Sequence, residues 1–347
     1  MSRIRFFDAT LRDGSHAIKH QLTKDTISSY CEAIDSAGMY TIVVGHGNGL
    51  GASSLQVGCS LLSDHEMLTT AREKLHHTKL GAYMIPGFGT IIDDIEPAIR
   101  AGVELFKIGC NCTEADTTRQ HIEYLRNEGK EVYGVLMMYH MASTEKILEE
   151  AQKMQSYGAQ GVILMDSAGA STPELVKRTI TTLVDNLYIA VGFHAHNNLG
   201  LAVGNTYTAI QQGATIVDGT LRGFGAGAGN CPLEVLAALL VKEGFEFKHD
   251  LYRMFDTSKD IIEPLMPYDK GLSDISIVNG MAGIFSAFKV HVLNAAKTFN
   301  VDPRDIMMEL GRRKVVGGQE DMIVQVAEEL ANPFKNNDDA FDFSSLV

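Results

Sequence analysis

The sequence predicts an α/β fold: a (β/α)8 barrel, also called a TIM barrel, followed by a small helical domain. Short apolar, strand-like runs alternate with amphipathic helical segments from residue 6 to about residue 242. Helical segments end at a glycine directly before the next strand, as at Ala37-Gly38, Ala101-Gly102 and Gln212-Gly213. Eight such units in about 240 residues favour a closed barrel over an open doubly wound sheet.

Each unit can be assigned to residues along the chain. The first strand ends near Asp8, and Thr23 is a fair N-cap for a helix that Gly38 ends. The other predicted strands cover residues 40–45, 79–85, 105–109, 131–137, 161–166, 188–194 and 216–220. The other predicted barrel helices cover residues 64–75, 91–101, 116–128, 143–157, 172–186, 199–213 and 232–242.

Beyond about residue 245 the strand pattern stops and only helical periodicity continues. The predicted helices there cover residues 251–265, 281–298, 303–313 and 320–331. We therefore expect a barrel over residues 1–245 and a helical domain over residues 246–331. The tail, residues 332–347, is polar and acidic and is expected to be mobile.

Composition limits the classes of function. A hydrophobic share of 45% with 21% charged residues is typical of a globular protein with a large core. The net charge of −13 argues against a nucleic-acid or anionic-membrane binder, because both need a basic surface. The N-terminus lacks the apolar core of a signal peptide, and no stretch reaches about 18 uninterrupted apolar residues, so a cytoplasmic protein is expected. Five cysteines without a CxxC pair give no disulfide framework.

Two strand ends carry most of the candidate chemistry. Asp13 lies in the turn after the first strand, and His194 and His196 end the seventh strand. Residues at i and i+2 of a strand face the same side, and the carboxyl ends of barrel strands open on one face. One oxygen and two nitrogen donors at this mouth predict a divalent-metal site. Arg12 and His16 supply charge and proton chemistry beside it.

Other residues near strand ends allow more than one interpretation. Lys107, inside the fourth strand, could form a Schiff base or be a fixed positive charge near a substrate carboxylate, and we favour the second. The glycine-rich run 225–230 could cradle a phosphate, or let backbone approach the metal and substrate with Asn230 as an outer contact. The second interpretation is favoured, because the run lacks the βαβ context of a dinucleotide fold.

Some polar residues are better explained without a ligand. Asn197 and Asn198 are expected to cap the helix that begins near Leu199. Cys110 and Cys112 are interpreted as small residues at a strand end rather than metal ligands. His46 and His140 also end strands, where they either line the mouth or are hydrogen-bonded within the core.

Four motifs carry a resemblance to a known family. They are TLRDGSHAI (residues 10–18), HAHNNL (194–199), GAGAGNCPLE (225–234) and VGGQEDMIV (316–324). Together they resemble the 4-hydroxy-2-oxovalerate aldolases, which belong to the metal-dependent barrels that include hydroxymethylglutaryl-CoA lyase and isopropylmalate synthase. The last motif separates the aldolases from these relatives.

The resemblance implies a site, a cofactor and a partner. It places a divalent metal, commonly manganese, on Asp13, His194 and His196, with magnesium, cobalt or zinc as alternatives. It makes Arg12 the residue that stabilises a pyruvate enolate and His16 the base. The helical domain would dock an acylating aldehyde dehydrogenase, in a homodimer or hetero-oligomer.

The chain departs from the family around the expected aldehyde pocket. Phe285, in AGIFSAF, replaces a tyrosine of the family, and Tyr83 replaces a leucine two residues before Ile85. Strand alternation places Tyr83 and Ile85 on the same side. We expect these three residues to line the aldehyde pocket, with Tyr83 bringing a hydroxyl to one wall while Phe285 removes one from the other. The preferred aldehyde is then expected to differ from acetaldehyde.

The function predicted from the sequence is an aldolase that cleaves a 4-hydroxy-2-oxo acid to pyruvate and an aldehyde. An acyl-CoA Claisen synthase or lyase on the same barrel is the alternative, disfavoured because those relatives usually carry a different C-terminal extension. A non-catalytic scaffold for a dehydrogenase is disfavoured because Arg12, Asp13, His16, His194 and His196 are all present.

Overall fold

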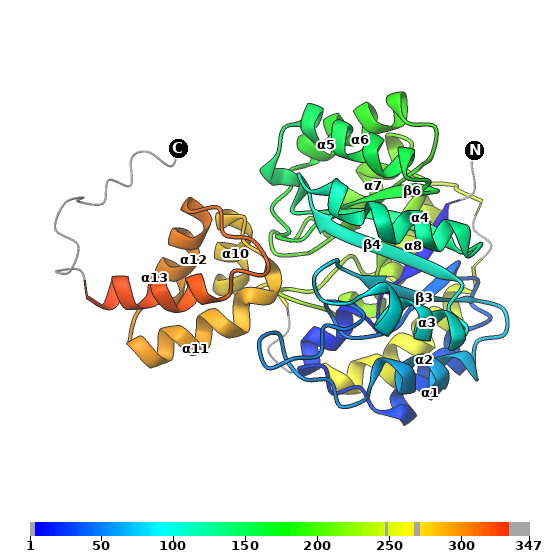
Figure 1. Ribbon diagram of the computed structural model, residues 1–347, viewed down its shortest axis with the longest axis horizontal. Coiled ribbons are helices and arrows are strands. Elements are labelled where there is room, and N and C mark those ends of the chain that lie inside the picture. The colour runs from blue at the N-terminus through cyan, green and yellow to red at the C-terminus, as the bar shows by residue number, and fades with distance from the viewer. Residues whose placement is uncertain (1–3, 247–248, 267–270, 333–347) are drawn as a thin grey trace.

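Eight parallel strands close into a barrel in sequence order, with β8 paired to β1. The computed structural model describes residues 4–246, 249–266 and 271–332 (Figure 1). The strands are β1 (Arg5–Asp8), β2 (Thr41–Val43), β3 (Lys79–Met84), β4 (Leu105–Asn111), β5 (Glu131–Met137), β6 (Gly161–Asp166), β7 (Ala190–Ala195) and β8 (Ile216–Gly219). The predicted (β/α)8 barrel is therefore confirmed.

A helix follows each strand. The helices are α1 (Lys24–Ile34), α2 (Asp64–Arg72), α3 (Glu96–Arg100), α4 (Arg119–Asn127), α5 (Thr144–Ser156), α6 (Pro173–Asn186), α7 (Ala202–Gln211) and α8 (Leu233–Lys242). Thr23 caps α1 by accepting the backbone N–H of Thr26, as predicted. Gly38 and Gly213 adopt φ values of 92° and 99°, a region that residues with a Cβ rarely enter, which explains glycine at these loops.

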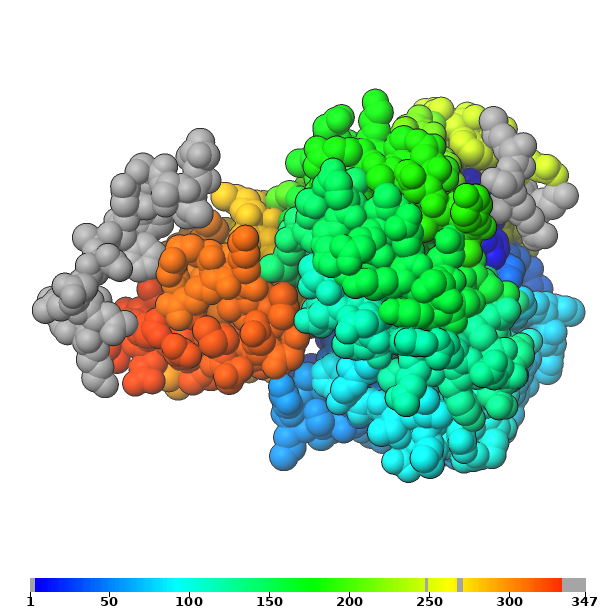
Figure 2. Space-filling view, turned by 45° about the horizontal axis from the view of Figure 1, so that its top comes forward, coloured from blue at the N-terminus to red at the C-terminus, as the bar shows by residue number. Residues whose placement is uncertain are grey.

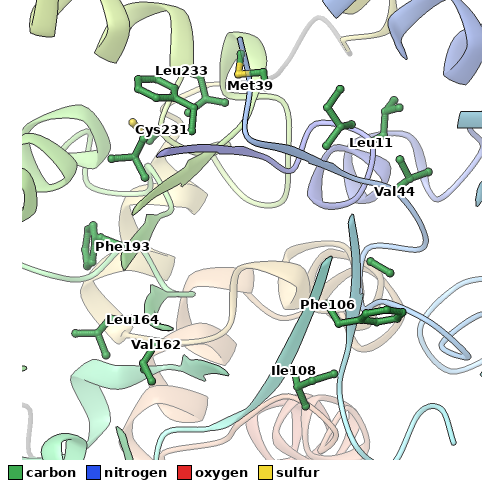
Figure 3. Close-up of a cluster of buried hydrophobic side chains, with 14 of the residues drawn as sticks. Leu11, Met39, Val44, Phe106, Ile108, Val162, Leu164, Phe193, Cys231 and Leu233 are labelled. Carbon is green, nitrogen blue, oxygen red and sulfur yellow. The ribbon is translucent and has the colours of Figure 1, made fainter. Parts of the chain in front are cut away.

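The core has an inner and an outer layer around the strands. Along β6, Val162 and Leu164 belong to the layer between strands and helices, whereas Ile163 and Met165 belong to the cluster inside the barrel. Figure 3 shows part of the outer layer, with Phe106 and Phe193 from β4 and β7. The alternation follows from the two-residue repeat of a strand and directs every second side chain to the barrel interior.

Several helical predictions differ from the structure. Residues 91–101 form a π-helical turn (Ile91–Ile95) that runs into α3 instead of one α-helix. The predicted helix 281–298 is wrong, because α10 (Asp274–Ala282) ends at Gly283, which has a left-handed φ of 66°. The chain begins α11 (Lys289–Phe299) only after a 3-10 turn. A glycine in this conformation is a typical helix stop, and it outweighed the apolar spacing that suggested continuity.

The first predicted C-terminal helix packs on the barrel. It consists of α9 (Leu251–Thr257), a π turn (Ser258–Ile262) and a 3-10 turn (Glu263–Leu265). Met254 and Ile262 are buried in the same cluster as the barrel helices. This segment was expected to begin the helical domain, but its side chains contribute to the barrel core.

The remaining helices form a separate core. Together with α10 and α11, α12 (Pro303–Arg312) and α13 (Asp321–Ala331) enclose Phe288, Val292, Ile306, Leu310 and Ile323. Figure 2 shows this helical domain, coloured orange and red, against one side of the barrel. The tail expected to be mobile, residues 332–347, lies outside the described residues except for Asn332. Among the described helices, none has the length and apolarity needed to span a membrane.

Candidate active site

Asp13, His194 and His196 meet at the carboxyl-terminal mouth of the barrel. Asp13 begins a 3-10 turn (Asp13–Ile18) after β1, His194 lies in β7, and His196 follows β7. All three are buried, and one ligand atom from each lies within 4.8 Å of the others. The predicted convergence of these two strand ends is thus present in the structure.

The donor atoms of this cluster fit a divalent cation. Nε2 of His194 and Nδ1 of His196 are buried without a hydrogen-bond partner, an arrangement that native structures rarely leave unexplained. Burial lowers the pKa of His196 to about 4, so its ring is neutral near pH 7, as metal binding requires. Burial alone would raise the pKa of Asp13, but Arg12 and the histidines hold it well below its usual value. Asp13 is therefore a carboxylate.

The glycine-rich run 225–230, hereafter the glycine loop, orients that carboxylate. Oδ1 of Asp13 accepts the backbone N–H of Ala226 at 3.2 Å and the side-chain amide of Asn230 at 2.7 Å. These bonds bring the loop backbone and Asn230 to Asp13, and the predicted approach of the glycines to a metal and substrate stays a prediction. A Cβ on Gly225 would lie 2.5 Å from Asp13 Oδ1, which leaves no space for a side chain there.

Arg12 keeps two donor groups unused. Nη1 donates to Asp13 Oδ2 at 2.7 Å and to the carbonyl of Gly47 at 3.1 Å. Nε and Nη2 are buried without a partner. The guanidinium carbon lies 4.8 Å from the ring centroid of Tyr83, within cation–π distance. A rigid guanidinium with two free donors is suited to an anionic group in the site.

His16 lines a narrow pocket together with Arg12, Asp13 and His196. Burial lowers the pKa of His16 well below its usual value, although Asp13 opposes this shift. The imidazole is therefore neutral near pH 7 and able to accept a proton. A Cβ on Gly47 would lie 2.3 Å from its Nε2, so the glycine gives the ring its space.

Two histidines behind His16 belong to the polar core. His20 and His46 stack with ring centroids 3.7 Å apart. Nδ1 of His46 accepts the backbone N–H of Asn48 at 3.0 Å, while Nε2 lies 3.0 Å from the carbonyl of Gly58. His46 is thus hydrogen-bonded on both sides, one of the two interpretations that the sequence left open.

The rest of the pocket wall is apolar. Besides the polar residues, it is lined by Tyr83, Ile85, Met137, Met165 and Phe285. The structure thus places all three predicted aldehyde-pocket residues here. A neighbouring cavity of about 340 Å³ shares Ile85, Met137 and Phe285 and extends to Gly317 and Gly318 of the helical domain.

Tyr83 contributes its ring to this wall. Its hydroxyl donates to Sδ of Met137 at 3.1 Å, and a Cβ on Gly109 would lie 2.2 Å from the hydroxyl oxygen. The hydroxyl hydrogen of Tyr83 is therefore already donated to Met137. The hydroxyl oxygen lies so close to Gly109 that no side chain fits at that position. The hydroxyl that Tyr83 is expected to bring to the aldehyde pocket is therefore not a free donor in this structure.

Lys107 lies inside the barrel and away from the pocket wall. Its ammonium forms a fully buried ion pair with Asp218 of β8, and Lys107 does not line the pocket. Burial lowers the pKa of Lys107, although Asp218 opposes this shift. Lys107 is predicted to be a fixed positive charge near a substrate carboxylate, but in the structure the carboxylate that pairs with its ammonium is that of Asp218. Asp218 is not among the residues predicted for the site, although an acidic residue in the otherwise apolar strand β8 is a signal that could have indicated it.

Asn198 and His140 have partners that the sequence did not indicate. Asn197 Oδ1 accepts the backbone N–H of Ala202 at 3.2 Å, as predicted for a cap of α7. The predicted capping by Asn198 is wrong, because its side chain bonds to Ala168, Ser286 and Ala228. Nε2 of His140 lies 3.1 Å from the carbonyl of Gly283 and so connects the barrel with the helical domain.

Comparison with known proteins agrees with this architecture. The HMGL-like family model matches residues 3–261, and the DmpG-like communication domain matches residues 271–332. A 4-hydroxy-2-oxovalerate aldolase of Pectobacterium atrosepticum is 51% identical over 335 residues, covering 96% of this chain and 98% of its own. The 4-hydroxy-2-oxovalerate aldolase of Spirochaeta aurantia is 49% identical, with 93% and 95% covered.

Solved structures share the fold at lower identity. The carboxyl transferase domain of Rhizobium etli pyruvate carboxylase with 3-bromopyruvate has a TM-score of 0.81 at 15% identity, over 100% of this chain and 64% of that one. At this identity the likeness concerns the fold alone. The sequence relatives and the family model carry the assignment: the chain belongs to the HMGL-like family and, within it, to the 4-hydroxy-2-oxovalerate aldolases.

Proposed function

We propose that this chain is a divalent-metal-dependent aldolase that cleaves a 4-hydroxy-2-oxo acid to pyruvate and an aldehyde. Relatives of about half-identical sequence over nearly the whole chain bear the name of this activity. The observation that carries the proposal is the pocket in which the unused donors of Arg12 lie beside the Asp13–His194–His196 cluster.

Asp13, His194 and His196 would hold the metal. A bound divalent cation supplies Lewis-acid polarisation of the 2-keto group and orients the substrate. Manganese is our preferred assignment, and magnesium, cobalt and zinc are the alternatives, since a mixed carboxylate and imidazole set suits several of these ions.

Arg12 and His16 carry the proton and charge chemistry. The neutral His16 accepts the proton of the 4-hydroxyl group, the C3–C4 bond breaks, and C4 leaves as the aldehyde carbonyl. The electron pair of the broken bond forms an enolate whose negative charge develops on the C2 oxygen. The free donors of Arg12 stabilise that charge, and protonation at C3 then yields pyruvate.

The aldehyde half of the substrate faces Ile85, Met137, Met165 and Phe285. Phenylalanine at position 285 brings no hydroxyl, and the Tyr83 hydroxyl is bound to Met137. We infer that this chain prefers an apolar aldehyde group, which it selects by shape rather than by hydrogen bonding.

The helical domain is the proposed docking site for an acylating aldehyde dehydrogenase. Its match to a communication domain supports an association of this kind. Large apolar side chains are exposed on its helices, among them Met281, Val290 and Val324. A cytoplasmic location and a homodimeric or hetero-oligomeric assembly belong to the same proposal.

The test supplies metal-loaded protein with a panel of 4-hydroxy-2-oxo acids and measures pyruvate release. Release that depends on added manganese, with an apolar 4-substituent preferred, is the expected result. Failure to form pyruvate from every acid, together with turnover of acyl-CoA thioesters, would replace the proposal by the Claisen alternative. Inactivity with both substrate classes would favour the scaffold interpretation.

A further inference from the structure

One buried amide joins several segments at the barrel mouth. Nδ2 of Asn198 donates to the carbonyl of Ala168 and to Oγ of Ser286, each at 2.8 Å. Oδ1 accepts the backbone N–H of Ala228 at 2.8 Å. Asn198 is fully buried, so both donor hydrogens and one acceptor site are committed without water. Its partners lie in the loops after β6 and β8 and in the helical domain.

Ser286 fixes the helical domain to this amide. Its backbone N–H and its hydroxyl both donate to the carbonyl of Ser167, at 3.1 and 2.7 Å. Because the hydroxyl hydrogen is used there, the oxygen is free to accept from Asn198. Gly280 of α10 packs nearby, since a Cβ there would lie 2.8 Å from Cγ of Leu199. The helical domain therefore reaches Asn198 through a specific hydrogen bond and a close contact.

The glycine loop borders both Asn198 and Ser286, since a Cβ on Gly227 would also lie 3.1 Å from Cβ of Ser286. Gly227 has a left-handed φ of 63°, and a Cβ there would lie 2.6 Å from Oδ1 of Asn198. The same loop donates the Ala226 N–H and the Asn230 amide to Asp13. A continuous set of contacts therefore runs from Ser286 through Asn198 and the glycine loop to the Asp13 carboxylate.

We propose that Asn198 is a positioning residue that couples the seating of the helical domain, through Ser286, to the orientation of the Asp13 carboxylate. Loss of the Ser286 contact leaves one buried N–H of the Asn198 amide unpaired, so the amide shifts. The backbone N–H of Ala228 in the glycine loop then loses Oδ1 of Asn198 as a fixed acceptor. The inference rests on the proposed role of Asp13 as a metal ligand. Asn198 itself takes no part in a catalytic step.

The test uses Ser286→Ala and Asn198→Asp in the full chain. Asparagine-to-aspartate keeps the shape and the acceptor for Ala228 but removes both donors. Free Mn²⁺ is measured by electron paramagnetic resonance during titration, and hydrogen exchange is measured over residues 225–230. We expect a loss of Mn²⁺ affinity of about tenfold in each variant, because changes in outer contacts of a metal ligand cost about 10–100-fold. Exchange in the glycine loop should become faster.

Ser273→Ala is the matched control. Ser273 caps α10 in the same helical domain by accepting the backbone N–H of Ser276, and this substitution weakens the domain without touching Asn198. It should leave Mn²⁺ affinity and glycine-loop exchange as in the wild type. Equal values for Ser286→Ala and the wild type would overturn the coupling, as would equal losses in Ser286→Ala and Ser273→Ala.

The two readouts separate this inference from the proposed metal site. If the wild type binds no Mn²⁺, the metal assignment fails. The coupling is then tested by hydrogen exchange in the glycine loop alone, by comparing Ser286→Ala with Ser273→Ala. If the wild type binds Mn²⁺ and Ser286→Ala matches it in both readouts, only the coupling fails. Should Asn198→Asp not fold, Ser286→Ala with its control still gives the answer.

Discussion

Oδ1 of Asp218 lies 3.3 Å from Nδ1 of His194, while its other oxygen pairs with Lys107 inside the barrel. The two atoms do not meet hydrogen-bond geometry in this structure, but a carboxylate facing Nδ1 favours a proton on that nitrogen and a free Nε2. We expect Asp218→Asn to lower Mn²⁺ affinity by about 10–100-fold, because the amide holds the ring less strongly. Titration of the variant against Asp185→Asn, an exposed control on α6, measures the effect. Unchanged Mn²⁺ affinity in Asp218→Asn would mean that the His194 ring does not depend on the Asp218 carboxylate for its orientation.

Arg12→Lys should reduce kcat by about 100-fold or more, which corresponds to about 3 kcal/mol of transition-state stabilisation. Lysine retains the positive charge. A single ammonium group cannot both contact Asp13 and Gly47 and supply the donors that Nε and Nη2 of Arg12 leave free. Exchange of pyruvate methyl protons with solvent isolates the enolate step from the aldehyde. Exchange at the wild-type rate would require a different role for Arg12.

Tyr83→Phe and Tyr83→Leu separate the ring from the hydroxyl. Phenylalanine keeps the ring near the Arg12 guanidinium and loses only the bond to Met137, so kcat/KM should remain close to the wild-type value. Leucine removes the ring and should cost about 1–2 kcal/mol, roughly 5- to 30-fold in kcat/KM. Cleavage kinetics with one apolar substrate provide the comparison. A larger loss in Tyr83→Phe than in Tyr83→Leu would assign the function to the hydroxyl.

Phe285→Tyr should shift aldehyde preference toward polar aldehydes. It adds a hydroxyl to an apolar wall, and hydrogen-bonded recognition discriminates more strongly than a methylene, which is worth about 1–3 kcal/mol. The aldol reaction of pyruvate with acetaldehyde, propanal and a polar aldehyde measures the preference. Identical ratios in the wild type and the variant would show that position 285 affects packing only.

Stability should fall as the pH is lowered from 6.5 toward 4. Burial lowers the pKa of His20 and His46 to about 4, below the ordinary value of 6.5. The unfolded chain therefore binds protons first in this window, which favours unfolding. His46→Gln should weaken this pH dependence even if it lowers stability at pH 7, whereas exposed His65→Gln should not. Denaturant unfolding at pH 5 and 7 is the measurement, and an unchanged slope in His46→Gln would contradict the assignment.

The sequence predicted what local periodicity determines. Strand and helix repeats defined the barrel, and the common direction of parallel strands brought Asp13 to His194 and His196. The partners of Lys107 and Asn198 could not be predicted, because Asp218 and Ser286 come close only through tertiary packing. Glycine at position 283 is a local signal for the end of a helix. The apolar residues on both sides of it pack in the core of the helical domain, and their spacing resembles that of one continuous helix.

Closure of the barrel determines when during synthesis the site can form. Arg5 of β1 pairs with Ile216 of β8, so the first strand of the barrel to be synthesised has no partner on one edge until nearly all of the barrel has been made. Pairing across such sequence separation is slow, and an open parallel edge is prone to association with other chains. Asp13 and the glycine loop come from the two sides of this final seam. A metal site that includes Asp13 would therefore form only after the barrel of the nascent chain has closed, in one late step of folding.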